Sequence, residues 1–238
     1  MEKIITEKLI ANQIPFHPDL PSKLAVYLTL LTEWNQKMDL IAPSPPEEIV
    51  DRHFMDSLTA LKTNFLSGAA SLIDVGTGAG FPGLCLALAC PALRVTLLDA
   101  REKRLSFLKA VLDATGLDNV SICHARAEDA AQTPAFREQF DLAVARALAP
   151  LPVLCEWLLP FVRSGGLALC WKGPSLGEEM QAGSRAAHLL GGKTEAPVPT
   201  PIFGRDWDHL LLPIRKSRPT PTAYPRKPGL TKSRPLGK

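Results

Sequence analysis

The stretch DVGTGAGFPG, residues 74–83, contains two overlapping patterns for binding a nucleotide-like cofactor. Its last three glycines fit G-x-G-x-x-G, the pattern of dinucleotide enzymes, whereas Asp74 and its first three glycines fit the D-x-G-x-G-x-G spacing of S-adenosylmethionine enzymes. Glycines allow the backbone to approach a ligand, and the start of the following helix offers unpaired N–H groups. A P-loop is disfavoured, because the stretch contains no lysine. The loop therefore indicates a cofactor without identifying it.

Acidic residues near the loop favour S-adenosylmethionine over a dinucleotide. Asp74 precedes the loop, Asp99 lies at the end of the apolar segment RVTLLDA, and Glu128 follows the apolar segment NVSIC. An acid beside the loop suits a cationic sulfonium better than a diphosphate, and Asp99 can accept hydrogen bonds from ribose hydroxyls. Glu128 or Asp129 can accept one from an adenine amino group, with Ala127 against the base. Each acid alone is also compatible with a solvated helix start, but together they resemble the class I methyltransferase layout.

These residues require a parallel sheet that brings the ends of its strands together. From residue 71 onward, short apolar segments alternate with amphipathic ones, which predicts an α/β fold: a Rossmann-like, mostly parallel seven-stranded sheet flanked by helices. The expected strands are 71–75, 94–100, 119–123, 140–145, 166–172, 194–198 and 208–216. The expected helices between them are 82–89, 101–115, 151–159 and 175–190.

The spacing of apolar residues in the N-terminal third of the chain predicts helices instead of strands. One expected helix buries a face on which apolar residues recur at three-to-four spacing: Leu24, Tyr27, Leu28, Leu31 and Trp34. Another is expected to begin with Ser44 as its N-cap and two prolines in its first turn. We therefore expect three parts, namely an N-terminal helical cap over residues 1–66, a methyltransferase core over 67–216 and a basic, proline-rich arm over 217–238.

The distribution of charge sets the C-terminal end apart. Residues 215–238 contain eight lysines or arginines, no acid and five prolines, so with +3 for the whole chain the first 214 residues carry −5. Prolines lack the N–H that helices and ladders need, which predicts an extended arm. Such an arm is either a solubilising terminus or a surface that contacts nucleic-acid phosphates. On the second interpretation, removing residues 224–238 lowers RNA affinity and leaves cofactor binding intact.

Composition limits the remaining classes of protein. A chain of 238 residues, 46% of them hydrophobic, is long enough to bury a substantial core. The N-terminus has no signal-like segment and no apolar run approaches the ~20 residues that span a bilayer, so we expect a cytoplasmic protein without membrane contact. We also expect a monomer. The five cysteines form no C-x-x-C pair and have no histidine at ligand spacing, which predicts buried free thiols and no metal site.

The segment after the fourth expected strand bears on the methyl acceptor. It reads AVARALAP, with Arg146 and without the [ND]-P-P-[YF] pattern typical of enzymes that methylate exocyclic amines. Methylation of pyrimidine carbon 5 needs a nucleophilic thiolate, but Cys170 lies within an expected strand and is interpreted as a core residue. A ring nitrogen such as guanine N7 has an exposed lone pair and no proton to remove, so its reaction requires mainly alignment.

Seven motifs carry a resemblance that covers nearly the whole chain: VDRHFMDSL, DVGTGAGFPGL, VTLLDAREKRLSFL, HARAED, FDLAVARAL, WKG and YPRKPGL. In this order they resemble the bacterial 16S rRNA (guanine-N7) methyltransferase family, also called glucose-inhibited division protein B. The resemblance implies methyl transfer from S-adenosyl-L-methionine to N7 of one guanosine, position 527 of 16S rRNA. The implied partner is 16S rRNA in the small ribosomal subunit or in an assembly intermediate. A methyltransferase that acts on another RNA is an alternative.

The resemblance, together with the loop, gives three groups of expected site residues. The cofactor contacts are Asp74, Gly76, Gly78, Phe81, Asp99, Ala100, Ala127, Glu128 and Arg146. The residues expected to position the reacting groups are Arg146, Lys172 and His53. The expected RNA contacts are Arg52, His53, Lys172, Tyr224, Arg226 and Lys227. Two alternatives stay open: Phe81 packs in the core, and Arg52 forms an intrahelical ion pair with Asp56.

Two positions depart from the family pattern. Ala145 and Leu148 stand where members often have serine and phenylalanine, which puts stacking of the target guanine on this loop in doubt. Trp171 or Phe54 is the expected substitute for the missing aromatic ring.

Two other classes of protein explain part of the pattern. A NAD-dependent oxidoreductase shares the glycines and Asp99, but it usually has a Tyr-x-x-x-Lys partner, which neither Tyr27 nor Tyr224 supplies. A non-catalytic RNA-binding module explains the basic arm and does not explain three acids at three strand ends.

Overall fold

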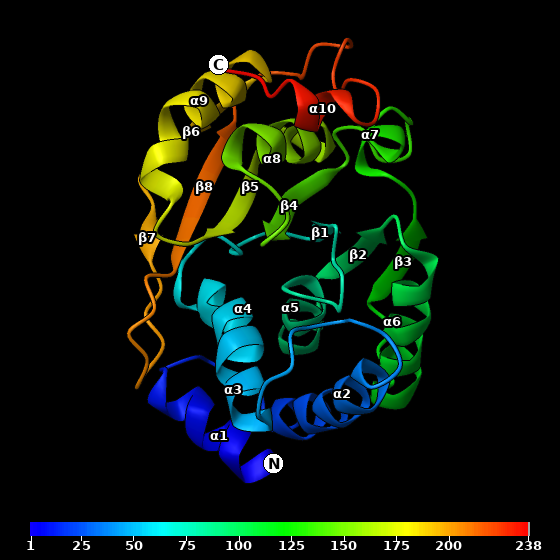
Figure 1. Cartoon of the computed structure of the whole chain (residues 1–238), viewed down its shortest axis with the longest axis vertical. Coiled ribbons are helices and arrows are strands. Elements are labelled where there is room, and N and C mark those ends of the chain that lie inside the picture. Colours follow the sequence, from blue (N-terminus) through cyan, green and yellow to red (C-terminus); the bar gives the residue numbers. More distant parts are fainter. Residues whose placement is uncertain (238) are drawn as a thin grey trace.

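The computed structural model describes residues 1–237 and shows a central sheet between two layers of helices (Figure 1). Its strands are β1 Ser71–Val75, β2 Arg94–Asp99, β3 Val120–His124, β4 Phe140–Arg146, β5 Val162–Lys172, β6 Gly192–Thr194, β7 Val198–Pro199 and β8 Leu210–Lys216. The strand order is β3-β2-β1-β4-β5-β8-β6, the first five being parallel and β8 antiparallel to β5. β6 and β7 pair with different parts of β8 and share the position at that edge, which confirms a mostly parallel sheet of seven positions.

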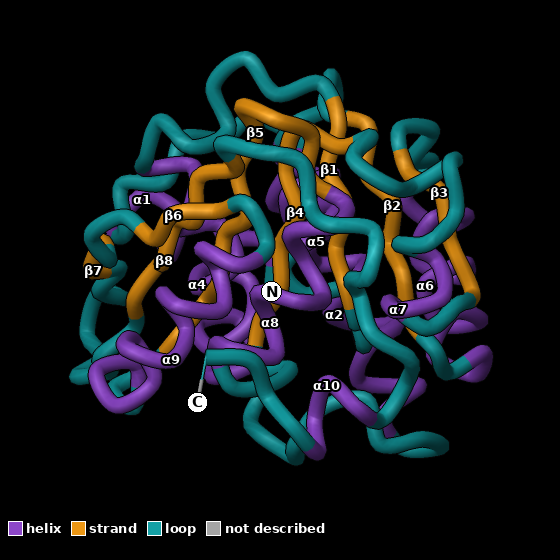
Figure 2. Tube along the Cα trace, turned by 90° about the horizontal axis from the view of Figure 1, so that it is seen from above, coloured by secondary structure: helices purple, strands orange, loops and turns teal. Residues whose placement is uncertain are grey.

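The helices surround this sheet, as the view from above shows (Figure 2). They are α1 Glu2–Ala11, α2 Leu20–Asn35, α3 Pro46–Ile49, the π-helical turn η1 Val50–Met55, α4 Asp56–Leu58, η2 Thr59–Lys62, α5 Gly83–Ala89, α6 Glu102–Thr115, α7 Ala127–Ala130, α8 Leu151–Leu158, η3 Leu159–Phe161, α9 Leu176–Leu189 and α10 Leu230–Ser233. The prediction of Ser44 as an N-cap is wrong. α3 starts at Pro46 and its N-cap position is the extended Pro45, so Ser44 lies one residue before the cap and no side chain caps the helix.

Two hydrophobic clusters pack on opposite faces of the sheet. One joins the N-terminal helices with α5 and α6, and the other joins α8 and α9. On α2, Leu24, Tyr27, Leu28 and Leu31 are all buried, as their spacing predicts, and Trp34 is partly buried. The N-terminal helices thus share one core with the sheet, which fixes η1 beside the end of β4. The boundaries proposed at residues 66 and 216 stay a prediction.

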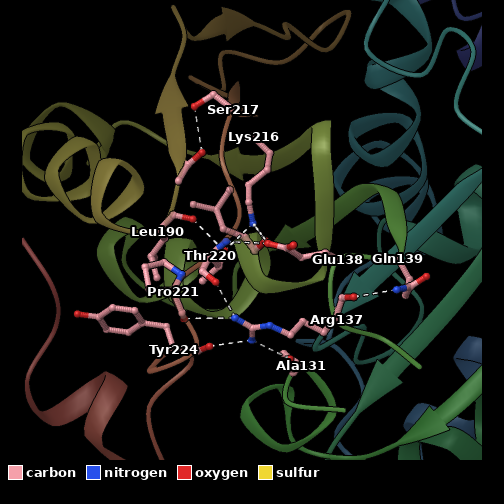
Figure 3. A network of polar contacts seen from close by, with 12 residues as sticks. Ala131, Arg137, Glu138, Gln139, Leu190, Lys216, Ser217, Thr220, Pro221 and Tyr224 are labelled. Carbon is pink, nitrogen blue, oxygen red and sulfur yellow. Dashed lines mark hydrogen bonds and ion pairs between the residues drawn. The ribbon is translucent and has the colours of Figure 1, made fainter. Parts of the chain in front are cut away.

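The C-terminal segment folds back onto the core, so the prediction of an extended arm is wrong. Arg137 donates 2.8 Å hydrogen bonds to the carbonyl oxygens of Thr220 and Tyr224 (Figure 3). The buried Lys216 ammonium donates to Thr220 Oγ1 and lies 3.1 Å from Glu138 (Figure 3). The prolines remove N–H donors, but their neighbours' carbonyls still accept from core side chains, and these bonds hold the segment. The last arm residue, Lys238, lies outside the described residues.

The cysteines are free, and three of the five are buried. Burial raises the pKa of Cys85 and of Cys170 to about 12, which makes both inert as nucleophiles at neutral pH. The core interpretation of Cys170 is therefore confirmed. Within residues 1–237, no helix combines the length and the apolar character needed to cross a bilayer.

Candidate active site

Asp74, the fourth residue of β1, supports the glycine loop through hydrogen bonds. Its Oδ2 accepts hydrogen bonds from the Thr77 hydroxyl (2.7 Å) and from the Gly83 N–H (2.8 Å). The carboxyl is fully buried, and burial raises its pKa to about 6 against the effect of these two donors. Its other oxygen has no hydrogen-bond partner among residues 1–237. Asp74 therefore shapes the loop and does not line the cavity above it, where the sequence predicted a cofactor contact.

Two glycines of the loop are required for different reasons. A Cβ on Gly83 would lie 2.6 Å from the Cβ of Asp74, so this glycine lets α5 start against β1. Gly76 has a φ of +70°, and a Cβ there would lie 2.6 Å from Leu148 Cδ1. Gly83 therefore serves packing, whereas Gly76 keeps the backbone close to the loop that follows β4.

A cavity of about 530 Å³, here called the cofactor cavity, opens at the carboxyl ends of β1, β2 and β3. Five of the nine predicted cofactor residues line it: Gly76, Asp99, Ala100, Ala127 and Glu128. Asp99 Oδ2 accepts from the Gly78 N–H (2.9 Å) and Oδ1 from the Arg101 N–H (2.8 Å). Because a carboxylate offers about four acceptor positions, Asp99 can still accept from two ribose hydroxyls. These residues therefore fit S-adenosylmethionine.

Glu128 is already engaged within the protein. Its Oε1 accepts a 3.0 Å hydrogen bond from the Trp157 indole, and the residue is 7% exposed. Trp157 also lines the cofactor cavity. The pair forms a fixed polar edge beside Ala127, which suits the adenine end of the cofactor. No sequence pattern pointed to Trp157, because it lies in an apolar segment of α8.

A second cavity of about 400 Å³, here called the basic cavity, lies on the other side of the loop after β4. Its charged lining consists of three cations, Arg52, Arg146 and Lys172, and one carboxylate, Asp56, which gives +2 with neutral histidines. Leu148 lines the cofactor cavity, whereas both of its neighbours in the chain line the basic cavity. The two cavities are therefore separated by one loop at the end of β4.

Arg146 is the centre of the basic cavity. One terminal nitrogen donates to Asp56 Oδ2 and to the Arg52 carbonyl, each at 2.8 Å, and the other lies 2.7 Å from His53 Nδ1. Burial and the Arg146 charge lower the pKa of His53 to about 3. Since a guanidinium only donates, Nδ1 accepts and the ring proton lies on Nε2. His53 is thus a neutral group with one free N–H.

Asp56 orients Arg146 from the opposite side. Its Oδ1 lies 2.8 Å from His209 Nδ1, and its backbone carbonyl accepts a 2.9 Å bond from the Trp171 indole. Burial opposes ionisation, but the hydrogen bond from His209 and the Arg146 charge outweigh it, so the pKa of Asp56 is lowered. No sequence pattern indicates a role for His209. For Asp56, the only role expected from the sequence is the alternative ion pair with Arg52. A histidine alone in a strand-like segment gives no sequence signal for such a role.

The structure contradicts the alternative, left open from the sequence, of an ion pair between Arg52 and Asp56. Arg52 pairs instead with Glu48 at 2.8 Å and lies over the Trp207 ring at 4.7 Å. Asp56 has two other partners, since Arg146 donates to its Oδ2 and His209 Nδ1 lies 2.8 Å from its Oδ1.

Phe81 lies beneath the basic cavity, in the packed position that the sequence left open as an alternative. The residue is 6% exposed and stacks on His53 with ring centroids 4.8 Å apart. The Arg146 guanidinium lies 5.0 Å from the same ring. Neither Phe81 nor Arg146 nor Gly78 lines the cofactor cavity.

The remaining predicted site residues divide into two groups. Lys172 lines the basic cavity and forms a 2.6 Å ion pair with Glu179. Of the two candidate aromatic rings, Trp171 lines the basic cavity, whereas Phe54 is fully buried. The tail residues Tyr224, Arg226 and Lys227 line neither cavity. Arg226 forms a 2.6 Å ion pair with the buried Glu156.

Comparisons with known proteins identify a family for this chain. The model of the family GidB, rRNA small subunit methyltransferase G, matches residues 21–200. Ribosomal RNA small subunit methyltransferase G of Alkaliphilus metalliredigens (strain QYMF) is 44% identical over 238 residues, covering 99% of this chain and 100% of that protein. The protein of the same name from Clostridium perfringens (strain 13 / Type A) is 42% identical over 221 residues, covering 93% and 92%.

Solved structures confirm the fold. A putative O-methyltransferase from Klebsiella pneumoniae aligns with a TM-score of 0.57 at 18% identity, covering 88% of this chain and 94% of that one. Cofactor-bound Rv0187 from MTB aligns with a TM-score of 0.54 at 20% identity, covering 85% and 91%. The class I methyltransferase fold predicted from the sequence is therefore confirmed.

Proposed function

Because this chain belongs to the rRNA small subunit methyltransferase G family, we propose that it transfers a methyl group from S-adenosylmethionine to N7 of a guanosine in 16S rRNA. The guanosine is the one at position 527, as the sequence resemblance implies. The observation that carries the proposal is the pair of cavities: one fits the methyl donor, the other is basic, and only the loop at the end of β4 separates them.

S-adenosylmethionine, when bound, supplies an electrophilic methyl group. The residues that would hold it are Gly76, Asp99, Ala100, Ala127 and Glu128, which line the cofactor cavity. Asp99 would accept hydrogen bonds from the ribose hydroxyls, and Gly76 would allow close approach of the backbone. The cavity is placed at the sheet edge where open α/β folds bind ligands.

The basic cavity is suited to orientation and not to proton removal. Guanine N7 has a lone pair, so its methylation needs no general base. Consistent with this, Nδ1 of His53 is already engaged by Arg146, and Lys172 is engaged by Glu179. We propose that Arg146, His53 and Lys172 position the RNA through N–H donors, and that Arg52 contacts phosphate at the rim.

The substrate and the acceptor atom can be tested together. Purified protein is incubated with labelled S-adenosylmethionine and one of three substrates: naked 16S rRNA, an assembly intermediate or the assembled small subunit. An N7-methylguanosine site is mapped by borohydride and aniline cleavage, which cuts RNA only at that modification. We expect a single cut at position 527. Label incorporation without aniline cleavage would contradict the acceptor atom, and no incorporation into any substrate would contradict the function.

A further inference from the structure

One wall of the cofactor cavity comes from the far end of the chain. Gly229 and Lys232 line the cavity together with Trp157, and α10 lies beside α7 and α8 (Figure 1). The family model matches residues 21–200, so Gly229 and Lys232 lie beyond it, whereas Trp157 lies within it. We propose that residues 224–237 complete the S-adenosylmethionine site, with Lys232 and Gly229 covering the side formed by Trp157 and Glu128. This inference rests on the proposed function.

Residues 224–237 are anchored directly beside the cofactor cavity. Arg226 donates to Glu156 through its backbone N–H (2.8 Å) and through its guanidinium (2.6 and 2.9 Å). Glu156 is fully buried and directly precedes Trp157. Gln132 adds a 2.8 Å hydrogen bond to the Pro225 carbonyl. A buried carboxylate that loses its partner is costly, so this anchor keeps the segment in one position.

From the anchor, a short series of contacts reaches the cofactor side. The Lys232 ammonium lies 5.2 Å from the centre of the Trp157 ring, within the range of a cation–π contact. The Trp157 indole donates to Glu128, which also lines the cavity. Lys232, Trp157 and Glu128 therefore form one wall built from three different elements.

A ligand in this cavity touches both the sheet side and the C-terminal side. It therefore binds best when the segment is docked, and by linkage it stabilises the docked segment. This reverses the expectation from the sequence that loss of the C-terminal residues leaves cofactor binding intact. It also assigns to part of the basic segment a role that does not involve RNA.

The first test is protection from trypsin in the full-length chain. Cleavage after Lys232, an exposed residue of α10, requires the segment to leave its place. Saturating S-adenosylhomocysteine is expected to slow this cleavage by about tenfold or more, since the ligand must dissociate first. Cleavage after Lys37, an exposed residue in a turn far from the cavity, is the internal control and keeps its rate.

The second test is affinity measured by titration calorimetry. Lys232→Met is expected to raise the Kd for S-adenosylhomocysteine by about three- to tenfold, since a cation–π contact and one wall group are lost. Arg234→Met removes the same charge from an exposed residue that does not line the cavity, and it is expected to leave the Kd unchanged. Equal Kd values for both variants and the wild type, without protection after Lys232, would overturn the inference alone. A wild-type chain that binds no S-adenosylhomocysteine would overturn the proposed function as well.

Discussion

The cofactor cavity and the basic cavity differ in how far apart along the chain their hydrogen-bonded residues lie. The glycine-loop side of the cofactor cavity depends on hydrogen bonds over short stretches of chain, since Asp99 accepts from Gly78, 21 positions before it, and from Arg101, two positions after it. The basic cavity depends on Arg146, which bonds Asp56 across 90 positions, and on His209, which bonds Asp56 across 153. A site built from backbone N–H groups and nearby acids leaves a motif in the sequence, whereas a site built from distant side chains does not.

The largest expected effect follows from removing the centre of the basic cavity. Arg146→Met removes the guanidinium partner of the buried Asp56 and leaves it with the hydrogen bond to His209, and we expect methyl transfer to fall by about 100-fold or more. Arg146→Lys keeps the charge without the planar fork and is expected to recover only part of the rate. Single-turnover transfer to 16S rRNA measures the loss, and calorimetry with S-adenosylhomocysteine is the control. A large loss of cofactor affinity would place Arg146 in the cofactor site after all.

A substitution of Asp99 is expected to affect the cofactor cavity and to leave the basic cavity unchanged. Asp99→Ala removes the acceptor for the Gly78 and Arg101 N–H groups and for the ribose, which predicts a Kd for S-adenosylhomocysteine about 30-fold higher. RNA affinity, measured by filter binding without cofactor, is expected to stay constant. Unchanged cofactor affinity would show that Asp99 only supports the loop.

A smaller effect is expected from His209, which acts on the reaction through Asp56. His209→Gln weakens the orientation of the carboxylate that holds Arg146, and we expect kcat to fall about fivefold, corresponding to one lost hydrogen bond. KM for RNA and the Kd for S-adenosylhomocysteine should hardly change. The double variant Asp56→Asn/His209→Gln should show no further loss from the histidine change. Additive effects of the two changes would contradict action through Asp56.

The smallest expected effects concern stability and have opposite signs in the two regions. The pKa of Asp74 is raised from 3.8 to about 6, so its contribution to stability is present below about pH 4 and is lost as the pH rises through 6. The pKa of His53 is lowered from 6.5 to about 3, so its contribution is present above about pH 6.5 and is lost as the pH falls toward 3.

Urea unfolding between pH 4 and 6.5 tests both signs. Asp74→Asn is expected to make the free energy of unfolding rise more steeply with pH, whereas His53→Gln is expected to flatten that rise. Asp113→Asn, at an exposed position of α6, is the surface control. The same change of slope in both variants would rule out this assignment.

Local patterns predicted most elements correctly, and five of the nine residues predicted to contact the cofactor line one cavity. The bounds of β1 match the prediction residue for residue, and α5 and α6 begin within one residue of their predicted starts. Asp99, Ala127 and Glu128 line the cofactor cavity as expected, because strand ends of a parallel sheet meet at one edge. The error about the arm concerns a segment whose partners are distant, because this segment docks on Arg137 and Glu156.

The sheet, the glycine loop and the acids at the strand ends follow from local patterns in the chain, because periodicity, glycine content and strand-end position are local properties. The places of Asp74, Phe81 and the basic tail follow only from the folded structure. Asp74 lies beneath the loop, Phe81 supports the basic cavity, and Lys232 reaches the cofactor cavity. The physical reason is that a side chain's partner depends on how helices and loops pack, and this packing brings together residues that no short pattern connects.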